Sequence, residues 1–326
     1  MIFDCHSDTF TDITLKRYNK EKNIFKKYHL NNFKKGNVCG SIFVIWIDPP
    51  YDNNPSLRAQ QIVQALKGEL EESKDVINVI KSFDDIGKGF AKSKVDILIG
   101  MEGLSHIGKD IDKIDYYYTE VYARHASLTW NEENDLATGV LGDENRGLTF
   151  LGKEAVKRLE SLHMLVDVSH LNEKSFWDLM NVASKPVIAS HSNSKSLCNV
   201  SRNLSDEQLK AIAASGGVIG LNGFAPFVSH DTNKQNLEGF IDHADYMANL
   251  IGVEHISLGF DYCDYLQSDT LSSFSSNVKN PNVKSLQCAS DSNNVIKELR
   301  KRGYSENEID LITHRNIFRV MGDVLR

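Results

Sequence analysis

Short apolar runs recur along the whole chain, and most are bounded by Gly, Pro, Asn or Asp. Most are rich in β-branched residues and too short for a helix, which favours strands. Several are apolar at nearly every position, as is typical of parallel strands that are covered on both faces. The predicted strands are residues 1–6, 38–47, 95–102, 123–130, 163–170, 186–191, 217–222 and 255–261.

Segments with helical spacing lie between many of these runs. Ile62 and Leu66, for example, are four residues apart and would share one face of a helix. Ser205 and Gln208 form a capping-box pair at the start of another helix, and Gly303 is typical of the residue after a helix end. The predicted helices are residues 56–73, 152–162, 206–214, 236–251, 292–302 and 306–325.

The alternation of strand and helix predicts an α/β protein with a closed (β/α)₈ barrel, in a single domain over residues 1–326. The active site of such a barrel lies at the C-terminal face of the strands. Residues 263–291, rich in Ser and Asn, follow the eighth predicted strand and would overhang the barrel mouth. This segment is either an ordinary surface loop, or a lid or subunit contact in a homodimer.

Composition adds the expectation of a soluble protein with a substantial core, because 41% of its 326 residues are hydrophobic and 25% are charged. The net charge of -7 gives no general reason to expect nucleic-acid or membrane binding. One local exception is residues 16–35, which hold eight Lys or Arg and a single acid, Glu21. We interpret this basic segment as a solvated surface.

The cysteines favour a reducing compartment. There are five, an odd number, and none forms a Cys-x-x-Cys pair. The chain also starts with a brief apolar run that reaches polar residues by Asp4, so we expect no signal peptide and no membrane span. These features predict a cytoplasmic protein.

The candidate chemistry lies where the predicted strands end. Six side chains that could bind metal occupy these positions, although they are remote from one another in sequence. Imidazoles and carboxylates that converge in this way are what a hydrolytic metal centre requires. The six residues are His6, Asp8, Glu102, His170, His191 and Asp261.

Spacing suggests how these ligands divide between two metal ions. His6 and Asp8 are two residues apart and would share one face of the first strand, so they can bind the same ion. Glu102 could bind that ion with one oxygen and a second ion with the other. His170 and His191, from the fifth and sixth predicted strands, would complete the second site.

Two such ions can share a water molecule and hold the resulting hydroxide between them. Asp261, on the strand that would lie beside the first one, is placed to accept and redeliver the proton. Asp4 and Asp167 are expected not to bind metal themselves and, at most, to form hydrogen bonds that orient the ligands. His125 is five residues from Trp130, so we expect it on the opposite face, outside the barrel.

Several motifs together identify a resemblance that covers nearly the whole chain. They resemble, in matching order, the membrane (renal) dipeptidase family of binuclear zinc peptidases. The resemblance implies a (β/α)₈ barrel that hydrolyses dipeptides, tolerates a C-terminal D-residue and in some members opens β-lactam rings. The motifs are Asp-Cys-His-Ser-Asp at 4–8, Met-Glu-Gly at 101–103, Asp-Val-Ser-His at 167–170, Ser-His-Ser at 190–192, Ser-Arg-Asn at 201–203 and Gly-Phe-Asp at 259–261.

The resemblance also implies roles for particular residues. One zinc would be held by His6, Asp8 and Glu102, and the other by Glu102, His170 and His191. The acid/base would be Asp261. The C-terminal carboxylate of the substrate would meet Arg202, whose alternative interpretation is a surface charge ahead of a helix. A weaker candidate for the substrate pocket is Asn222.

One departure from the family concerns the segment Ser127-Leu-Thr-Trp130. The family has a histidine at the last position, thought to polarise the scissile carbonyl. An indole N–H donates one hydrogen bond but cannot be cationic. Trp130 could line the pocket or donate to the carbonyl oxygen, and the change bears on rate and substrate choice.

Two other functions are open at this point. The first is a metal-dependent nuclease or phosphoesterase on the same barrel, with the basic segment guiding a polynucleotide. The second is a catalytically weak descendant that keeps its metals and binds a ligand, as Trp130 suggests. No Gly-x-Ser-x-Gly elbow, Walker A loop or Gly-x-Gly-x-x-Gly fingerprint supports other chemistries.

Overall fold

A ring of parallel strands forms the centre of the protein. The computed structural model describes residues 1–276 and 281–326. Within these residues eight strands pair in parallel, and the pairing of β1 with both β2 and β9 and of β2 with β4 closes the ring. The predicted (β/α)₈ barrel is therefore confirmed. Its strands are β1 (Ile2–Ser7), β2 (Val38–Trp46), β4 (Val95–Glu102), β5 (Ala123–Ser127), β6 (Leu165–Asp167), β7 (Val187–Ala189), β8 (Val218–Leu221) and β9 (Ile256–Leu258).

A further strand, β3 (Ile77–Val79), lies outside the closed ring and was not predicted. It pairs with residues 95–97 of β4, while β5 pairs with residues 99–102 on the same edge. Only Ile77 of its three residues is buried. The apolar stretch around it, Val76-Ile-Asn-Val-Ile80, is short and interrupted by Asn78, which explains the omission.

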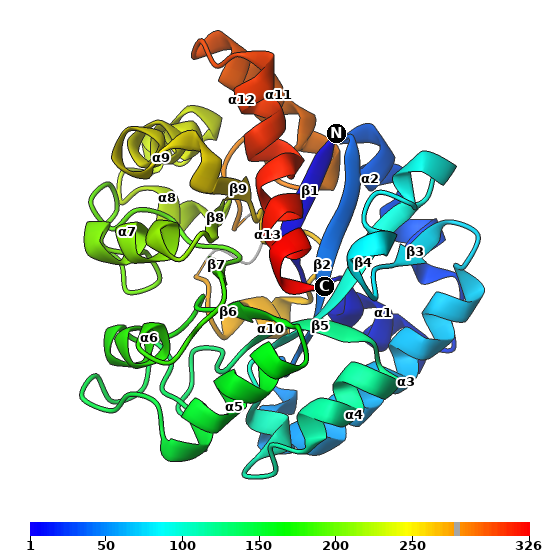
Figure 1. The fold of residues 1–326 in the computed structure, drawn as a ribbon. Helices are drawn as coiled ribbons and strands as arrows, with labels where there is room; N and C mark the ends of the chain where they lie inside the picture. The colour runs from blue at the N-terminus through cyan, green and yellow to red at the C-terminus, as the bar shows by residue number, and fades with distance from the viewer. Residues whose placement is uncertain (277–280) are drawn as a thin grey trace.

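Helices surround the ring, as Figure 1 shows. The predicted helices all exist, with one difference: residues 306–325 are two helices joined by a π-helical turn at Leu311–Arg315. The helices of the described residues are α1 (Thr9–Tyr18), α2 (Leu30–Lys35), α3 (Pro55–Glu72), α4 (Lys113–Glu120), α5 (Phe150–Ser161), α6 (Glu173–Met180), α7 (Asp206–Ala214), α8 (Ala225–Val228), α9 (Leu237–Ile251), α10 (Ser268–Ser272), α11 (Asn293–Lys301), α12 (Glu306–Asp310) and α13 (Asn316–Val324).

The apolar core consists of two clusters. The larger one lies between the strands and the surrounding helices. The second fills the barrel and joins inward side chains of the strands, such as Phe3 and Leu98, to Val320 and Met321 of α13. In Figure 1 the red helix α13 crosses the centre of the ring. It covers the end where the strands begin, because the Phe3 ring lies 5.4 Å from that of Phe318. The opposite end is left for a site.

Local signals read from the sequence appear where expected. Ser205 and Gln208 make both hydrogen bonds of a capping box at the start of α7. Gly303 has a φ of 90° just after α11, a conformation that favours glycine. Among the described helices, none is long and apolar enough to cross a membrane.

Candidate metal centre

The six predicted ligands converge at the carboxyl ends of the strands. His6 and Glu102 lie at the ends of β1 and β4, and Asp8 follows β1 directly. The other three come later than predicted, because β6, β7 and β9 end at Asp167, Ala189 and Leu258. The loops beyond them carry the remaining ligands, which are His170, His191 and Asp261.

The end of β1 directs two ligands inward. The pairing of β1 with β2 shifts register between Asp4 and Ser7, which interrupts regular alternation there. Cys5 packs inside the barrel, with its Sγ 3.3 Å from Ser257 Oγ. His6 and Asp8 still face each other, with 3.6 Å between His6 Nε2 and Asp8 Oδ2.

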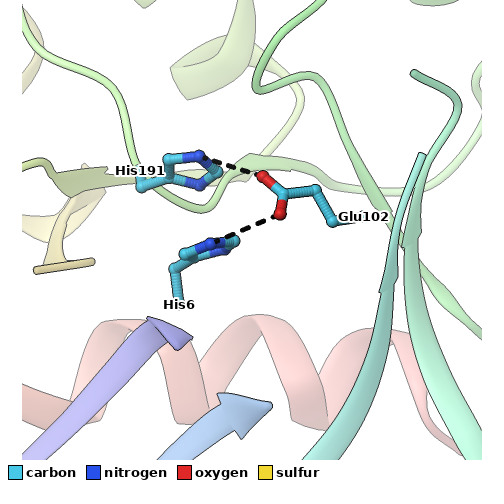
Figure 2. A group of neighbouring side chains, drawn as sticks. All are labelled: His6, Glu102 and His191. Atoms are coloured by element: carbon cyan, nitrogen blue, oxygen red, sulfur yellow. Dashed lines mark ion pairs between the residues drawn. The ribbon is translucent and has the colours of Figure 1, made fainter. Parts of the chain in front are cut away.

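Glu102 lies at the middle of the group. Its Oε2 is 3.7 Å from His6 Nε2, and its Oε1 is 2.8 Å from His170 Nε2 and 3.6 Å from His191 Nε2. Figure 2 shows Glu102 with one carboxylate oxygen directed at each of the His6 and His191 rings. One carboxylate oxygen therefore faces His6, and the other faces His170 and His191.

Two overlapping sets of ligand atoms are compact enough to hold an ion. His6, Glu102 and His191 form one, and His6, Asp8 and Asp261 form the other, with the atoms of each set within 4.8 Å of one another. Asp261 Oδ1 lies 3.9 Å from His6 Nε2. Nitrogen and oxygen donors in this number are those that zinc and similar divalent ions use.

Hydrogen bonds determine which ring nitrogens are free. His170 Nδ1 lies 2.8 Å from Asn131 Oδ1, an acceptor, so Nδ1 carries the proton. His191 Nδ1 donates to Ser190 Oγ at 2.7 Å, because that hydroxyl donates onward to Asp167 Oδ2. The two Nε2 atoms then present lone pairs to each other at 2.8 Å. A cation relieves this repulsion, so the donor set fits a metal.

The electrostatics of the site also favour cations. Burial acts to lower the pKa of His6, but the carboxylates of Glu102, Asp8 and Asp261 outweigh it and raise this pKa to about 10. Burial, with help from the neighbouring carboxylates, raises the pKa values of Glu102 and Asp261 themselves. Such a concentration of buried carboxylates is stable when a cation balances it.

Burial lowers the pKa values of His170 and His191 well below the usual range, and the positive charge of Arg202 adds to the effect. Both rings are therefore neutral at physiological pH. A neutral imidazole is the form that coordinates a metal.

Behind the ligands, Asp167 organises the loops after β6 and β7. Its Oδ1 accepts from the backbone N–H of Ser169 and Ser190, and its Oδ2 accepts from Ser190 Oγ and from His125 Nε2 at 3.0 Å. The prediction that His125 lies outside the barrel is wrong. A Cβ on Gly100 would meet the His125 ring inside it, so the missing side chain at Gly100 admits the imidazole.

Asp4 has a comparable role between β1 and the loop after β9. Its Oδ1 accepts from the Phe260 N–H at 2.9 Å and from the His6 N–H at 3.3 Å. Asn131 and Ser190, the hydrogen-bond partners of His170 and His191, were not predicted from the sequence. Each adjoins a predicted site residue, but only tertiary contacts reveal the bonds.

The three predicted substrate residues lie in different surroundings. Arg202 is buried beside the ligands, where Nη2 donates to the His191 carbonyl at 3.3 Å, and it lines the cavity above them. Asn222 is fully buried and donates to Asp261 Oδ2 at 3.1 Å, so it lies behind the cavity wall. Trp130 lines the cavity, with its ring 6.1 Å from that of His170.

The cavity above the ligands has a volume of about 780 Å³ and reaches Asp8, Glu102, His170 and Asp261. This is the size of a small-molecule site. Residues 272–276, from the segment predicted to overhang the mouth, form part of its wall. Residues 277–280 of that segment lie outside the described residues.

Comparisons with known proteins agree with this geometry. A sequence model of the membrane dipeptidase family (peptidase family M19) matches residues 1–326. An uncharacterized protein in the pqqA 5' region of Klebsiella pneumoniae is 33% identical over 69% of this chain and 79% of its own length. The dipeptidase aclJ of Aspergillus oryzae is 28% identical over 89% of this chain and 68% of its own length.

Solved structures share the fold. A metallo peptidase from Rhodobacter sphaeroides, liganded with a phosphinate mimic of the dipeptide L-Ala-D-Ala, superimposes with a TM-score of 0.86. The two sequences are 21% identical, and the match covers 99% of each chain. The likeness of fold therefore covers nearly the full length of both chains.

Proposed function

This chain belongs to the membrane dipeptidase family and is a metal-dependent dipeptidase, and we propose that its centre holds two zinc ions. The observation that carries the proposal is the position of Glu102, whose two oxygens face His6 on one side and His170 and His191 on the other. One ion would be held by His6, Asp8 and Glu102. The other would be held by Glu102, His170 and His191.

Bound divalent ions would supply a water of lowered pKa and polarise the scissile carbonyl. The chain's own residues hold and orient the dipeptide and move the proton. Asp261 is the proposed acid/base: its carboxylate takes a proton from the attacking water and delivers it to the leaving amine. Asn222 supports this role, because its donated hydrogen bond fixes the orientation of Asp261.

Arg202 is the proposed partner of the substrate's C-terminal carboxylate. Burial lowers its pKa to about 10, so the guanidinium remains charged at neutral pH. Its Nε has no hydrogen-bond partner among the described residues and is free for a ligand. The buried Arg202 guanidinium would bind the substrate's carboxylate at a fixed distance from the metal ligands. Together with a carboxylate for the α-amine, this would favour substrates of dipeptide length. The free α-amine would meet a carboxylate of the metal site.

Tolerance of a C-terminal D-residue is part of the proposal. The Rhodobacter sphaeroides protein of the same fold is liganded with a mimic of L-Ala-D-Ala, which supports this extension. Trp130 is proposed to line the substrate pocket in place of the family's histidine. A cytoplasmic location is also proposed, because all five cysteines are free thiols.

Neither rival function gains support from a particular observation. Arg17 and Lys26 of the basic segment form ion pairs with Glu72 and Asp75, and no described residue of the segment lines the cavity above the ligands. A polynucleotide held by this segment would therefore lie away from the ligands. The second rival, a descendant that binds a ligand, would retain the metal ions but would not hydrolyse dipeptides.

The test is hydrolysis by metal-free protein that is reloaded with Zn²⁺, Mn²⁺ or Co²⁺. We expect cleavage of L-Ala-L-Ala and L-Ala-D-Ala only after loading. We expect little cleavage of L-Ala-L-Ala-L-Ala, because a tripeptide with its carboxylate at Arg202 brings a peptide group, and not the free amine, to the metal-site carboxylate. Amino-acid release measures the rate. Protein with two bound metals and no dipeptide turnover would favour the ligand-binding descendant, and cleavage of a phosphodiester instead would favour the nuclease.

A further inference from the structure

Aromatic side chains form one continuous wall of the cavity above the ligands. Five of them line it, from four separate parts of the chain: Trp46, Trp130, Phe224, Phe227 and Phe274. Phe274 joins the two halves of this aromatic wall. Its ring centroid lies 6.1 Å from Trp46, 6.3 Å from Trp130 and 6.1 Å from Phe224.

The wall has two ends with different surroundings. At one end the Trp46 and Trp130 rings lie 5.3 Å apart. At the other end Phe227 packs 4.7 Å from Phe224 and lies under the Arg202 guanidinium at 5.5 Å. A charged group bound at Arg202 would therefore lie beside Phe227, and the other end of the wall presents the two indole rings.

Strand order indicates which part of a dipeptide reaches each end. Arg202 follows β7, and Trp46 is the last residue of β2, which lies four places from β7 around the eight-stranded ring. These two residues are thus on opposite sides of the metal centre. Trp46 also lies directly beside Glu102 on the neighbouring strand. A dipeptide with its carboxylate at Arg202 extends its amino-terminal residue across the ligands towards Trp46.

We propose that the Trp46–Trp130–Phe274 end of the aromatic wall is a binding site for a large apolar side chain on the amino-terminal residue of the substrate. This inference rests on the proposed function, since it uses Arg202 as the carboxylate partner. The preferred substrates are dipeptides that begin with Phe, Tyr, Trp or Leu. Offset and edge-to-face packing against three rings favours an aromatic side chain most.

The test compares isomeric dipeptides. We expect kcat/KM for L-Phe-L-Ala to exceed that for L-Ala-L-Phe and L-Ala-L-Ala by about tenfold or more, because filling an apolar subsite commonly gives a factor of this size. We also expect kcat/KM for L-Phe-D-Ala to exceed that for L-Ala-L-Phe and L-Ala-L-Ala. Equal values, or a preference for L-Ala-L-Phe, would overturn the assignment.

Two variants locate the site. Phe274→Ala and Trp130→Ala remove partly exposed rings, so both variants are expected to fold. Each should lower the ratio of kcat/KM for L-Phe-L-Ala to that for L-Ala-L-Ala by about tenfold. Phe150→Ala removes a ring that is 76% exposed and is not among the residues that line the cavity. This variant is the matched control and should leave the ratio unchanged.

The outcomes separate this inference from the function beneath it. If the metal-loaded wild-type protein hydrolyses no dipeptide, the proposed dipeptidase function itself is refuted. Turnover of L-Ala-L-Ala without any preference for an aromatic first residue would refute the subsite alone. An unchanged ratio in both Phe274→Ala and Trp130→Ala would do the same.

Discussion

Asp261 owes its proposed chemistry to its neighbours. Its backbone has a φ of 55°, in the left-handed region that Asp tolerates better than most residues. This conformation turns the side chain towards His6 and Asn222 while 18% of its surface remains exposed to the cavity. Burial raises its pKa, so the carboxylate exchanges a proton more readily near neutral pH.

Replacing Asp261 with Asn should leave metal content nearly unchanged and reduce kcat at least about 100-fold, the usual effect of losing a positioned acid/base. Metal analysis and dipeptide kinetics provide the two measurements. Asp269→Asn, which changes an exposed acid in α10, is the control and should be close to wild type. Loss of one metal from Asp261→Asn would instead make Asp261 a ligand, and a near-normal kcat would remove it from the mechanism.

At the scale of elements, Asp167 connects three strands. It ends β6, accepts a hydrogen bond from His125 of β5, and binds Ser190 in the loop after β7. These bonds hold the loops that carry His170 and His191. Although burial acts to raise the pKa of Asp167, the hydrogen bonds outweigh it and lower this pKa to about 2.

A depressed pKa stabilises the fold when the carboxylate is charged. The contribution of Asp167 is therefore complete above its ordinary pKa of 3.8 and disappears as pH falls towards about 2. Asp167→Asn should lower the free energy of unfolding at pH 7 by about 2 kcal/mol, since one pKa unit corresponds to about 1.4 kcal/mol. It should also weaken the loss of stability between pH 4 and pH 2.

Urea unfolding of metal-free protein at pH 7 and pH 3 measures both effects. The exposed Asp84→Asn should change the free energy of unfolding by less than about 0.5 kcal/mol. If Asp167→Asn unfolds with the same free energy and the same pH dependence as the wild type, its bonds do not stabilise the loops.

At the scale of the whole molecule, the metal centre joins distant parts of the ring. Glu102 of β4 faces His6 of β1 on one side and His170 and His191, from the loops after β6 and β7, on the other. Metal binding at this point would tie these parts together. It would stabilise the folded barrel because ions bind the native state more tightly than the unfolded chain.

Glu102→Gln tests this connection. An amide offers one acceptor oxygen and no charge, so it cannot serve two ions. We expect the variant to bind less than half the metal of the wild type and to lose most of the rise in Tm that Zn²⁺ produces. Metal analysis and thermal unfolding with and without Zn²⁺ are the measurements.

Glu133→Gln changes an exposed acid three residues after Trp130 and is the control for Glu102→Gln. It should keep the metal content of the wild type and its rise in Tm with Zn²⁺. Full metal content with an unchanged Tm response in Glu102→Gln would refute the bridging position.

The sequence by itself determined the order of the elements and the identity of the candidate ligands. Apolar runs indicate buried strands wherever burial is continuous, and polar residues at their ends must lie at one face of a parallel barrel. The structure brings together the six residues predicted in this way, which are His6, Asp8, Glu102, His170, His191 and Asp261. The predicted strands β6, β7 and β9 were too long. The loops that follow them, which carry His170, His191 and Asp261, are buried like the strands and cannot be distinguished from them by their apolar pattern.

Only the tertiary structure decided what surrounds the ligands. Three contacts join residues that are far apart in the chain. They are the hydrogen bond that His170 donates to Asn131, the position of His125 inside the barrel beside Gly100, and the packing of Phe274 against two tryptophans. Local patterns record which side chains are buried, but not which partner each one meets. The partners depend on the paths of the loops, which form only when the ring has closed.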